Sequence, residues 1–156
     1  MTAHQAALEA LTRYFGYDSF RPGQQGIVEA LLAGHDVLGV MPTGAGKSVC
    51  YQIPAALSPG ATLVISPLIS LMRDQVDALN DLGMPAAFIN TTQTPDEQAM
   101  VFAQAAAGQI KLLYVAPERL ETGRFRDFAA RTPISLIAVD EAHCSPSGVR
   151  TSARRT

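Results

Sequence analysis

Apolar and polar residues follow two periods along the chain, one typical of amphipathic helices and one of buried strands. Segments with apolar residues every three or four positions predict helices, several of which end at a glycine. Short runs that are apolar throughout predict strands. Helices are expected over residues 4–15, 24–33, 47–59, 68–82, 95–107 and, in broken form, 118–131. Strands are expected over residues 36–41, 61–66, 86–90, 111–115 and 134–140.

The predicted strands are apolar on both faces, which suits a parallel sheet covered by helices on both sides. Strands and helices alternate with short connections, so we expect an α/β fold of the doubly wound type in one domain. Ligands of such sheets bind at the carboxyl ends of the strands. Two polar motifs follow predicted strands at these ends, and they are the candidate site.

Composition narrows the class of protein. With 156 residues, 47% of them hydrophobic, and a net charge of −2, the chain is expected to be globular and not disordered. No run of about 18 apolar residues predicts a membrane span, and no secretory signal is visible, so we expect a cytoplasmic protein. Cys50 and Cys144 lack a CxxC partner, which excludes a zinc site or disulfide scaffold within the chain.

Charge is unevenly distributed. Residues 145–156 hold three arginines and no acid, which leaves a net charge of −5 over residues 1–144. The main part of the chain therefore lacks the basic footprint typical of nucleic-acid-binding proteins, and any such contact must come from local groups. Nothing in the sequence implies a membrane partner or an oligomer.

The first motif follows strand 36–41 and reads Met41-Pro42-Thr43-Gly44-Ala45-Gly46-Lys47-Ser48. It departs from the phosphate-loop pattern G-x-x-x-x-G-K-[ST] at Met41, where the pattern has glycine. The two glycines let backbone N–H groups turn toward phosphate oxygens, and the following helix directs its positive end at the same anion. We expect Lys47 to reach the β- and γ-phosphates and Ser48 to bind Mg²⁺. The alternative is a glycine-rich turn with a solvated lysine.

The second motif is Asp140-Glu141-Ala142-His143, directly after strand 134–139. An acid at the tip of a buried strand faces the ligand-binding edge, so Asp140 is expected to hold Mg²⁺ and Glu141 to orient and deprotonate a water. His143 is expected to couple this site to neighbouring elements. Four letters alone are a weak match, and the alternative is a solvated turn in which Asp140 caps a helix.

These motifs, together with the segment Phe15-Gly16-Tyr17-Asp18-Ser19-Phe20-Arg21-Pro22-Gly23-Gln24, resemble the RecQ family of ATP-dependent DNA helicases over about residues 10–144. The resemblance implies a RecA-like P-loop nucleotidase fold that binds ATP and Mg²⁺. It also implies that Gln24 bonds the adenine edge, while Tyr17 and Arg21 contact its face. Amide groups can read adenine, and aromatic or guanidinium planes can stack on it. Phe20 is more simply interpreted as a core residue.

Two further segments are similar to the family's DNA-contacting motifs, Ser66-Pro67-Leu68-Ile69-Ser70-Leu71-Met72-Arg73-Asp74-Gln75-Val76 and Val115-Ala116-Pro117-Glu118-Arg119-Leu120. The resemblance implies that Ser66, Arg73, Gln75 and Arg119 contact the backbone of single-stranded DNA. Arg73 and Arg119 each stand beside an acid, so they could equally be surface charges. Residues 91–94 read as a polar turn with a helix cap, and Cys50 as a buried small residue.

The resemblance ends after residue 144. Family members continue with an aromatic-rich loop, I-S-Q-W-G-x-D-F-R-P, whereas this chain reads SPSGVRTSARRT and contains no tryptophan. Deleting one base from codons for ISQWGPDFRPAD yields this tail, so we interpret residues 145–156 as a frameshifted, disordered segment after a domain of residues 1–144. The first motor domain is then incomplete after strand 134–140, which leads into Asp140-Glu141-Ala142-His143 and is called the DEAH strand. We expect a gap between this strand and strand 36–41, the phosphate-loop strand, and the backbone groups that face the gap would be unpaired.

The leading hypothesis is the ATP-binding N-terminal part of a RecQ-like 3'-5' DNA helicase for repair and recombination, itself inactive in unwinding. A truncated remnant that binds nucleotide or nucleic acid without catalysis is the main alternative. A GTPase or small-molecule kinase is a third hypothesis, and the lack of an N-K-x-D motif opposes it.

Overall fold

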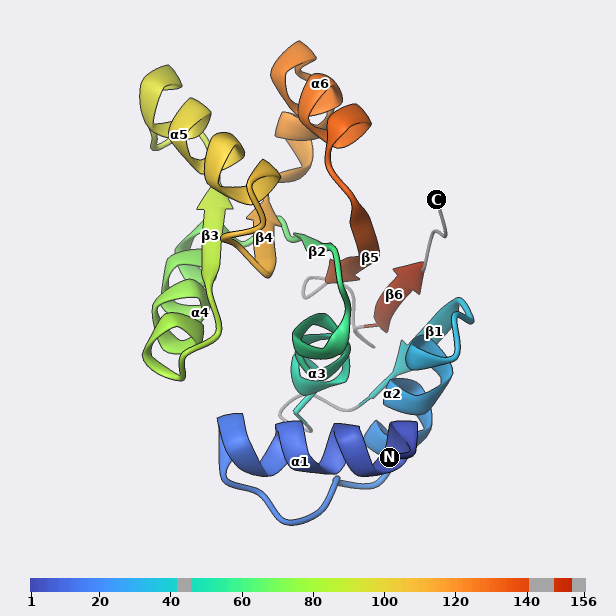
Figure 1. Ribbon diagram of the computed structural model, residues 1–156. Helices are drawn as coiled ribbons and strands as arrows, with labels where there is room; N and C mark the ends of the chain where they lie inside the picture. Colours follow the sequence, from blue (N-terminus) through green and yellow to red (C-terminus); the bar gives the residue numbers. More distant parts are fainter. Residues whose placement is uncertain (42–45, 141–147, 153–156) are drawn as a thin grey trace.

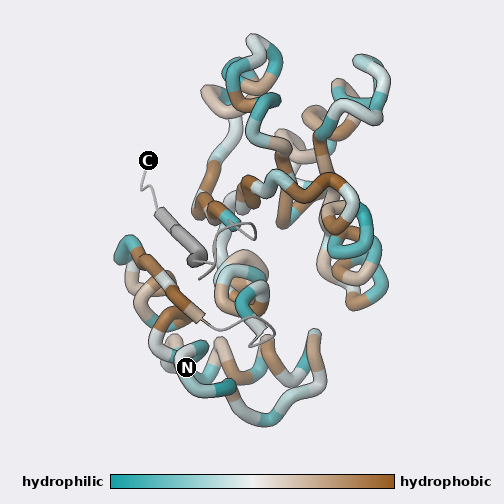
Figure 2. Tube along the Cα trace, turned by 180° about the vertical axis from the view of Figure 1, so that it is seen from behind, coloured by the Kyte–Doolittle hydropathy of each residue, from teal (hydrophilic) through white to brown (hydrophobic). Residues whose placement is uncertain are grey.

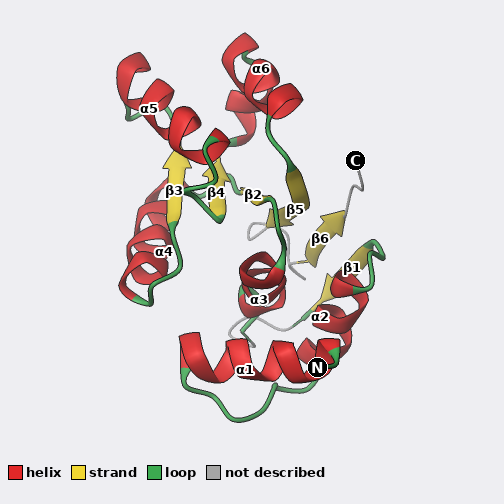
Figure 3. Cartoon of the chain, viewed as in Figure 1, coloured by secondary structure: helices red, strands yellow, loops and turns green. Residues whose placement is uncertain are grey.

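The computed structural model describes residues 1–41, 46–140 and 148–152. Its helices are α1 (Ala3–Phe15), α2 (Gln24–Leu32), α3 (Val49–Leu57), α4 (Ile69–Asp81), α5 (Pro95–Ala106), α6 (Gly123–Arg131) and the 3-10 helix η1 (Pro117–Glu121). Its strands are β1 (Val37–Val40), β2 (Ala61–Ile65), β3 (Ala86–Ile89), β4 (Leu112–Val115), β5 (Ile134–Asp140) and β6 (Gly148–Ser152). Every element expected up to residue 140 is confirmed to within two residues at each end (Figure 3).

Helices α1 and α5 begin where the local sequence predicts. Thr2 and Thr94 each accept a hydrogen bond from the backbone N–H three residues later. The side chains of Gln5 and Glu97 bond back to the cap residues and complete two capping boxes. The predicted helix cap within residues 91–94 is thereby confirmed.

The strands form one sheet in the order β1-β6-β5-β2-β4-β3 (Figure 1). β5, β2, β4 and β3 are parallel neighbours. Because β6 is antiparallel to both β1 and β5, those two strands share one direction. The predicted parallel α/β sheet is confirmed, and the phosphate-loop strand and the DEAH strand have their carboxyl ends at the same edge.

Strand β6 corrects the prediction for residues 148–152. We expected disorder and an open gap, but Gly148–Ser152 lies between β1 and β5, and Thr151 is the register partner of both Val37 and Ala138. The unpaired backbone groups of the two strands supply the physical reason, since they need hydrogen-bond partners whatever side chains the intervening strand carries. The frameshift origin of the tail stays a prediction, and residues 145–147 and 153–156 lie outside the described residues.

Helices cover both faces of the sheet. Alternate strand residues divide between two cores, because successive side chains of a strand point to opposite faces. Leu112 and Tyr114 of β4 pack with α3 and α4, whereas Leu113 and Val115 pack with α5 and α6. Viewed from behind, the strands β2, β4 and β5 carry mostly hydrophobic colours between the more polar helices (Figure 2).

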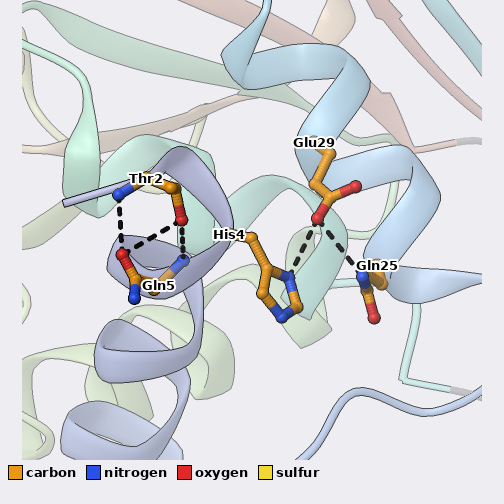
Figure 4. Close-up of polar contacts among 5 residues, drawn as sticks. All are labelled: Thr2, His4, Gln5, Gln25 and Glu29. Carbon is orange, nitrogen blue, oxygen red and sulfur yellow. Dashed lines mark hydrogen bonds and ion pairs between the residues drawn. The ribbon is translucent and has the colours of Figure 1, made fainter.

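Helix α1 forms a further layer that packs mainly against α2 and α3. Its buried residues Ala7, Ala10 and Leu11 pack on Val28 of α2 and Ile53 of α3. The Nδ1 atom of His4 lies 2.9 Å from Oε1 of Glu29, which links α1 to α2 at the surface (Figure 4). Within the described residues, every helix is too short or too polar to cross a bilayer.

Candidate functional site

A cleft of about 650 Å³ opens at the edge of the sheet where β1, β2, β4 and β5 end. It brings together most of the predicted nucleotide-site residues and two of the predicted DNA contacts. The predicted residues that line it are Tyr17, Arg21, Gln24, Gly46, Lys47, Ser48, Ser66, Gln75 and Asp140. Thr43, Gly44, Ala45, Glu141 and His143 were also predicted for the site, and they lie outside the described residues.

The end of the phosphate loop is tied to the segment before α2 through Gln24. The Gln24 side chain is only 3% exposed; its Nε2 donates to the carbonyl of Gly46 at 2.9 Å, and its Oε1 accepts from the Arg21 backbone N–H at 2.9 Å. Gly46 has a φ of +74°, and a Cβ there would lie 2.5 Å from Gln24 Nε2. This position therefore requires glycine for both backbone conformation and space.

Lys47 and Asp140 line the same cleft, and the positive charge of Lys47 acts on the Asp140 carboxyl. Burial raises the pKa of the Asp140 carboxyl, and the Lys47 ammonium opposes that rise. Lys47 comes directly before α3 and Asp140 ends β5, so the two charges reach the cleft from separate elements. A cation and a carboxylate at this edge are suited to a phosphate and its metal ion, respectively.

Helix α3 begins at the phosphate loop, and its first turn uses backbone carbonyls of the motif. Gln52 N–H donates to the Ser48 carbonyl at 2.9 Å, and Cys50 N–H donates to the Lys47 carbonyl at 3.1 Å. The Ser48 hydroxyl makes no capping bond to the helix. Hydroxyl and carboxylate oxygens are hard donors of the kind that Mg²⁺ prefers, so Ser48 and Asp140 fit the predicted metal.

Met41, which departs from the phosphate-loop pattern, is a packing residue. Its side chain is buried, and its sulfur accepts a weak hydrogen bond from the Cys50 thiol at 3.7 Å. Burial raises the pKa of Cys50 to about 11, so this thiol stays protonated at neutral pH. The prediction that Cys50 is a buried small residue is confirmed. The contact anchors the start of the loop on α3.

The predicted adenine-binding residues lie at the same cleft. Tyr17 is 49% exposed, and the Arg21 guanidinium carbon lies 6.0 Å from its ring centroid. Phe20 packs against the core between α1, α2 and α3, as expected for a core residue. A flat aromatic ring and a guanidinium at the cleft are suited to stacking on a base, and the adenine-binding roles stay predictions.

The four predicted DNA contacts divide into two pairs. Ser66 and Gln75 line the cleft beside the nucleotide-site residues. Arg73 lies on the exposed side of α4, 5.8 Å from the Phe88 ring centroid, and Arg119 lines a separate groove of about 410 Å³. The buried Nε of Arg119 makes no hydrogen bond within the described residues.

Sequence reasoning missed the polar wall of the cleft. Gln52 and Tyr114 line it, and Tyr51 lies just behind. Tyr114 could have been found, because it stands near the carboxyl end of a predicted strand, where ligands of α/β sheets bind. Tyr51 and Gln52 carry no such signal, since their apolar neighbours make them read as part of a buried helix.

Comparison with known proteins gives one family and one consistent group of relatives. The family described as DEAD/DEAH box helicase matches residues 21–154. The chain is 52% identical over 138 residues to the ATP-dependent DNA helicase RecQ of Haemophilus influenzae, covering 88% of this chain and 22% of that protein. It is 47% identical over 139 residues to the protein of the same name in Bacillus subtilis, covering 88% and 24%.

A plant relative and a solved structure extend the comparison. The ATP-dependent DNA helicase Q-like 5 of Arabidopsis thaliana is 44% identical over 145 residues, covering 90% of this chain and 16% of that protein. The crystal structure of a hypothetical ATP-dependent RNA helicase from Sulfolobus tokodaii superposes with a TM-score of 0.66 at 22% identity, over 88% of this chain and 41% of that one. This likeness shows the fold. The chain spans about a fifth of the length of the bacterial relatives.

Proposed function

Because the chain belongs to the DEAD/DEAH box helicase family, we propose that its cleft binds ATP with Mg²⁺ as part of a RecQ-like helicase motor. The observation that carries the proposal is that Lys47 and Asp140, which belong to two separate motifs, line one cleft. Their side chains supply the cation suited to a phosphate and the carboxylate suited to its metal ion. A solvated turn at either motif would leave the Asp140 carboxyl without the influence of the Lys47 charge.

Each residue of the cleft has a role under this proposal. Lys47 bonds the β- and γ-phosphates, while the backbone around Gly46 turns N–H groups toward the same oxygens. Ser48 and Asp140 would hold Mg²⁺, which supplies charge neutralisation between the phosphates when bound. Gln24, Tyr17 and Arg21 bind adenine. Glu141 orients the attacking water and His143 couples the site to its neighbours.

The whole protein is proposed to be an ATP-dependent 3'-5' DNA helicase of the cytoplasm, acting in repair and recombination. The names of the similar proteins support the ATP-dependent DNA helicase activity in this proposal. Single-stranded DNA would run over the rim formed after β2 and β4, with Arg73 and Arg119 on its phosphates. Strand separation needs two motor domains that open and close, so we expect the 156-residue chain alone to show no unwinding.

Nucleotide selectivity tests the proposed function most simply. Titration of the purified chain with Mg–ATP and Mg–GTP in a calorimeter should show binding of ATP in preference to GTP. Equal affinity for the two, or no heat with either, would contradict it. Measuring phosphate release in the same samples separates the main proposal from the alternative of a nucleotide-binding module without catalysis.

A further inference from the structure

Helices α5 and α6 border a groove of about 470 Å³, here called the α5–α6 groove. The two helices stand together at the end of the molecule farthest from α1 (Figure 1). Phe102 and Phe128 form the base of the groove, with their ring centroids 5.0 Å apart. The α5–α6 groove and the nucleotide cleft share no described residue, so the groove is a separate feature of the surface. Its other lining residues are Ala99, Ala103, Ala106, Arg124, Asp127, Arg131 and Thr132.

The two helices run in the same direction along the groove. At one end, Arg124 in the first turn of α6 donates from Nη1 to the carbonyl of Pro95 in the first turn of α5, at 2.8 Å. At the other end, Thr132 follows α6 and lines a small hollow together with residues 105–108, where α5 ends. Both helices therefore end beside Thr132, and helix carboxyl ends carry a partial negative charge.

The open side of α5 is apolar. No charged residue occurs between residues 98 and 110, although the solvent-facing side of a surface helix normally carries charges. The three alanines of the groove, Ala99, Ala103 and Ala106, are exposed, and the neighbouring Met100 is 64% exposed. Small side chains let the axis of a second helix come close, because the residues at the contact set the distance between packed helices. This side of α5 is therefore suited to packing against another helix.

The charges at the two ends of the groove are complementary to an antiparallel copy of α5. Asp96 lies in the first turn of α5, and Arg131 lines the groove at the opposite end. A second α5 that runs antiparallel and is centred near Ala103 would place its Asp96 at Arg131. Two-fold symmetry repeats the same pair at the other end of the contact. Such a pair fixes the direction of the second helix more than it adds affinity.

Thr132 gives an independent indication that the same end of the groove takes a polar group. Its side chain lines the groove and is only 8% exposed, and its hydroxyl has no hydrogen-bond partner within the described part of the chain. A buried hydroxyl without a partner costs free energy. The carboxylate of Asp96 from an antiparallel second copy would arrive at this end, where it can accept from both the Thr132 hydroxyl and the Arg131 guanidinium.

We propose that two copies of this chain associate through α5, each α5 lying antiparallel in the α5–α6 groove of the other copy. The contact is self-complementary, since each copy supplies the alanine side of α5, an acid at one end and an arginine at the other. The proposal goes beyond the proposed function, and association through this groove leaves the nucleotide cleft open.

Sedimentation velocity of the 156-residue chain tests the association. A contact between pairs of helices is at the small end of interface sizes, so we expect a dimer with a dissociation constant on the order of 10–100 μM. Ala103→Glu places two carboxylates face to face near the two-fold axis and should weaken the dimer by about tenfold or more. Gln104→Glu is the matched control, because Gln104 is exposed on α5 outside the groove, and we expect a change below about twofold. A monomer at every concentration, or a dimer that Ala103→Glu leaves intact, would overturn the proposal.

Charge reversal tests the antiparallel direction. Asp96→Arg and Arg131→Asp should each weaken the dimer, because each brings like charges together, and the double variant should return to within about threefold of the unaltered chain. Arg126→Asp is the control, since Arg126 is exposed on α6 and does not line the groove. Circular dichroism confirms that each variant is folded. A double variant as weak as the two single variants, or an equal loss in Arg126→Asp, would overturn the pairing of Asp96 with Arg131.

Discussion

The side-chain amide of Gln24 donates to the backbone carbonyl of Gly46 at 2.9 Å. This hydrogen bond joins the start of α2 to the phosphate loop across 22 residues of sequence. It places the proposed adenine reader directly against the proposed phosphate cradle, so a base and its phosphates would be held by one connected unit. Both residues can be altered with a matched neighbour as control.

Replacing Gly46 with alanine should destabilise the chain. The φ of +74° is strained for alanine, and the new Cβ would lie 2.5 Å from Gln24 Nε2. We expect a loss of roughly 1–3 kcal/mol in the free energy of unfolding, measured by urea denaturation. Gly26→Ala is the control, because a Cβ there meets nothing within 4 Å on α2, and we expect it to stabilise by about 0.5–1 kcal/mol. Equal effects of the two substitutions would contradict the close approach.

Replacing Gln24 with alanine should remove the preference for ATP over GTP. The substitution deletes both the proposed adenine contact and the bond to Gly46. Gln25→Ala is the matched control, since Gln25 is exposed and bonds only Glu29 among the contacts observed for its side chain. Competition between the two nucleotides, measured by fluorescence polarisation, checks the result. Retained ATP preference in Gln24→Ala would remove Gln24 from base recognition.

Replacing Asp140 with asparagine should have opposite effects on the empty and the nucleotide-bound chain. Burial raises the pKa of this carboxyl, so the protonated form favours folding at low pH, and that contribution is lost as the pH rises through the folded pKa. At neutral pH the charge therefore costs stability, and Asp140→Asn should melt at an equal or higher temperature. The same variant should lose the Mg²⁺ dependence of nucleotide binding. The control is Asp77→Asn, on the exposed side of α4, which should change neither the melting temperature nor the Mg²⁺ dependence of nucleotide binding. A lower melting temperature of nucleotide-free Asp140→Asn would contradict the claim that burial of the charged carboxyl costs stability.

The buried thiol predicts a fall in stability at alkaline pH. The pKa of Cys50 rises from 9.0 to about 11 in the folded chain, so the unfolded chain ionises first and is favoured as the pH increases. From pH 8 to pH 10 this thiol should cost roughly 1 kcal/mol of unfolding free energy. Denaturation of the unaltered chain and Cys50→Ala at both pH values measures the difference. An identical pH slope in the two proteins would show that Cys50 is accessible to water.

The elements up to residue 140 could be predicted because their signals are local. Capping at Thr2 and Thr94 and the all-apolar runs of the strands depend on neighbours in sequence. Strand β6 could not be predicted, since it exists through pairing with β1 and β5 and not through its own composition. All predicted nucleotide-site residues within the described ranges converge on one cleft, because parallel strands end at one edge.

Gln75 shows the limit of reading a site from sequence. The position of Gln75 in a family motif implied that it contacts DNA. In the structure, its side chain lines the cleft and accepts a hydrogen bond from the Tyr51 hydroxyl. The contact joins residues 24 positions apart on two helices, and no local pattern encodes it. The same holds for Gln24 and Gly46, whose bond depends on how α2 packs beside the loop.

Binding of Mg–ATP to Lys47→Ala tests the central claim most directly, with Lys111→Ala as the control. Lys47 and Lys111 are the two lysines of the chain, and Lys111 bonds the Ser58 carbonyl at 2.8 Å and does not line the cleft. Loss of a charged hydrogen bond of about 1.5–3 kcal/mol predicts roughly 10- to 100-fold weaker binding by calorimetry for Lys47→Ala. Lys111→Ala should bind like the unaltered chain. Equal affinity in all three proteins, or the greater loss in Lys111→Ala, would mean that ATP does not bind at the cleft.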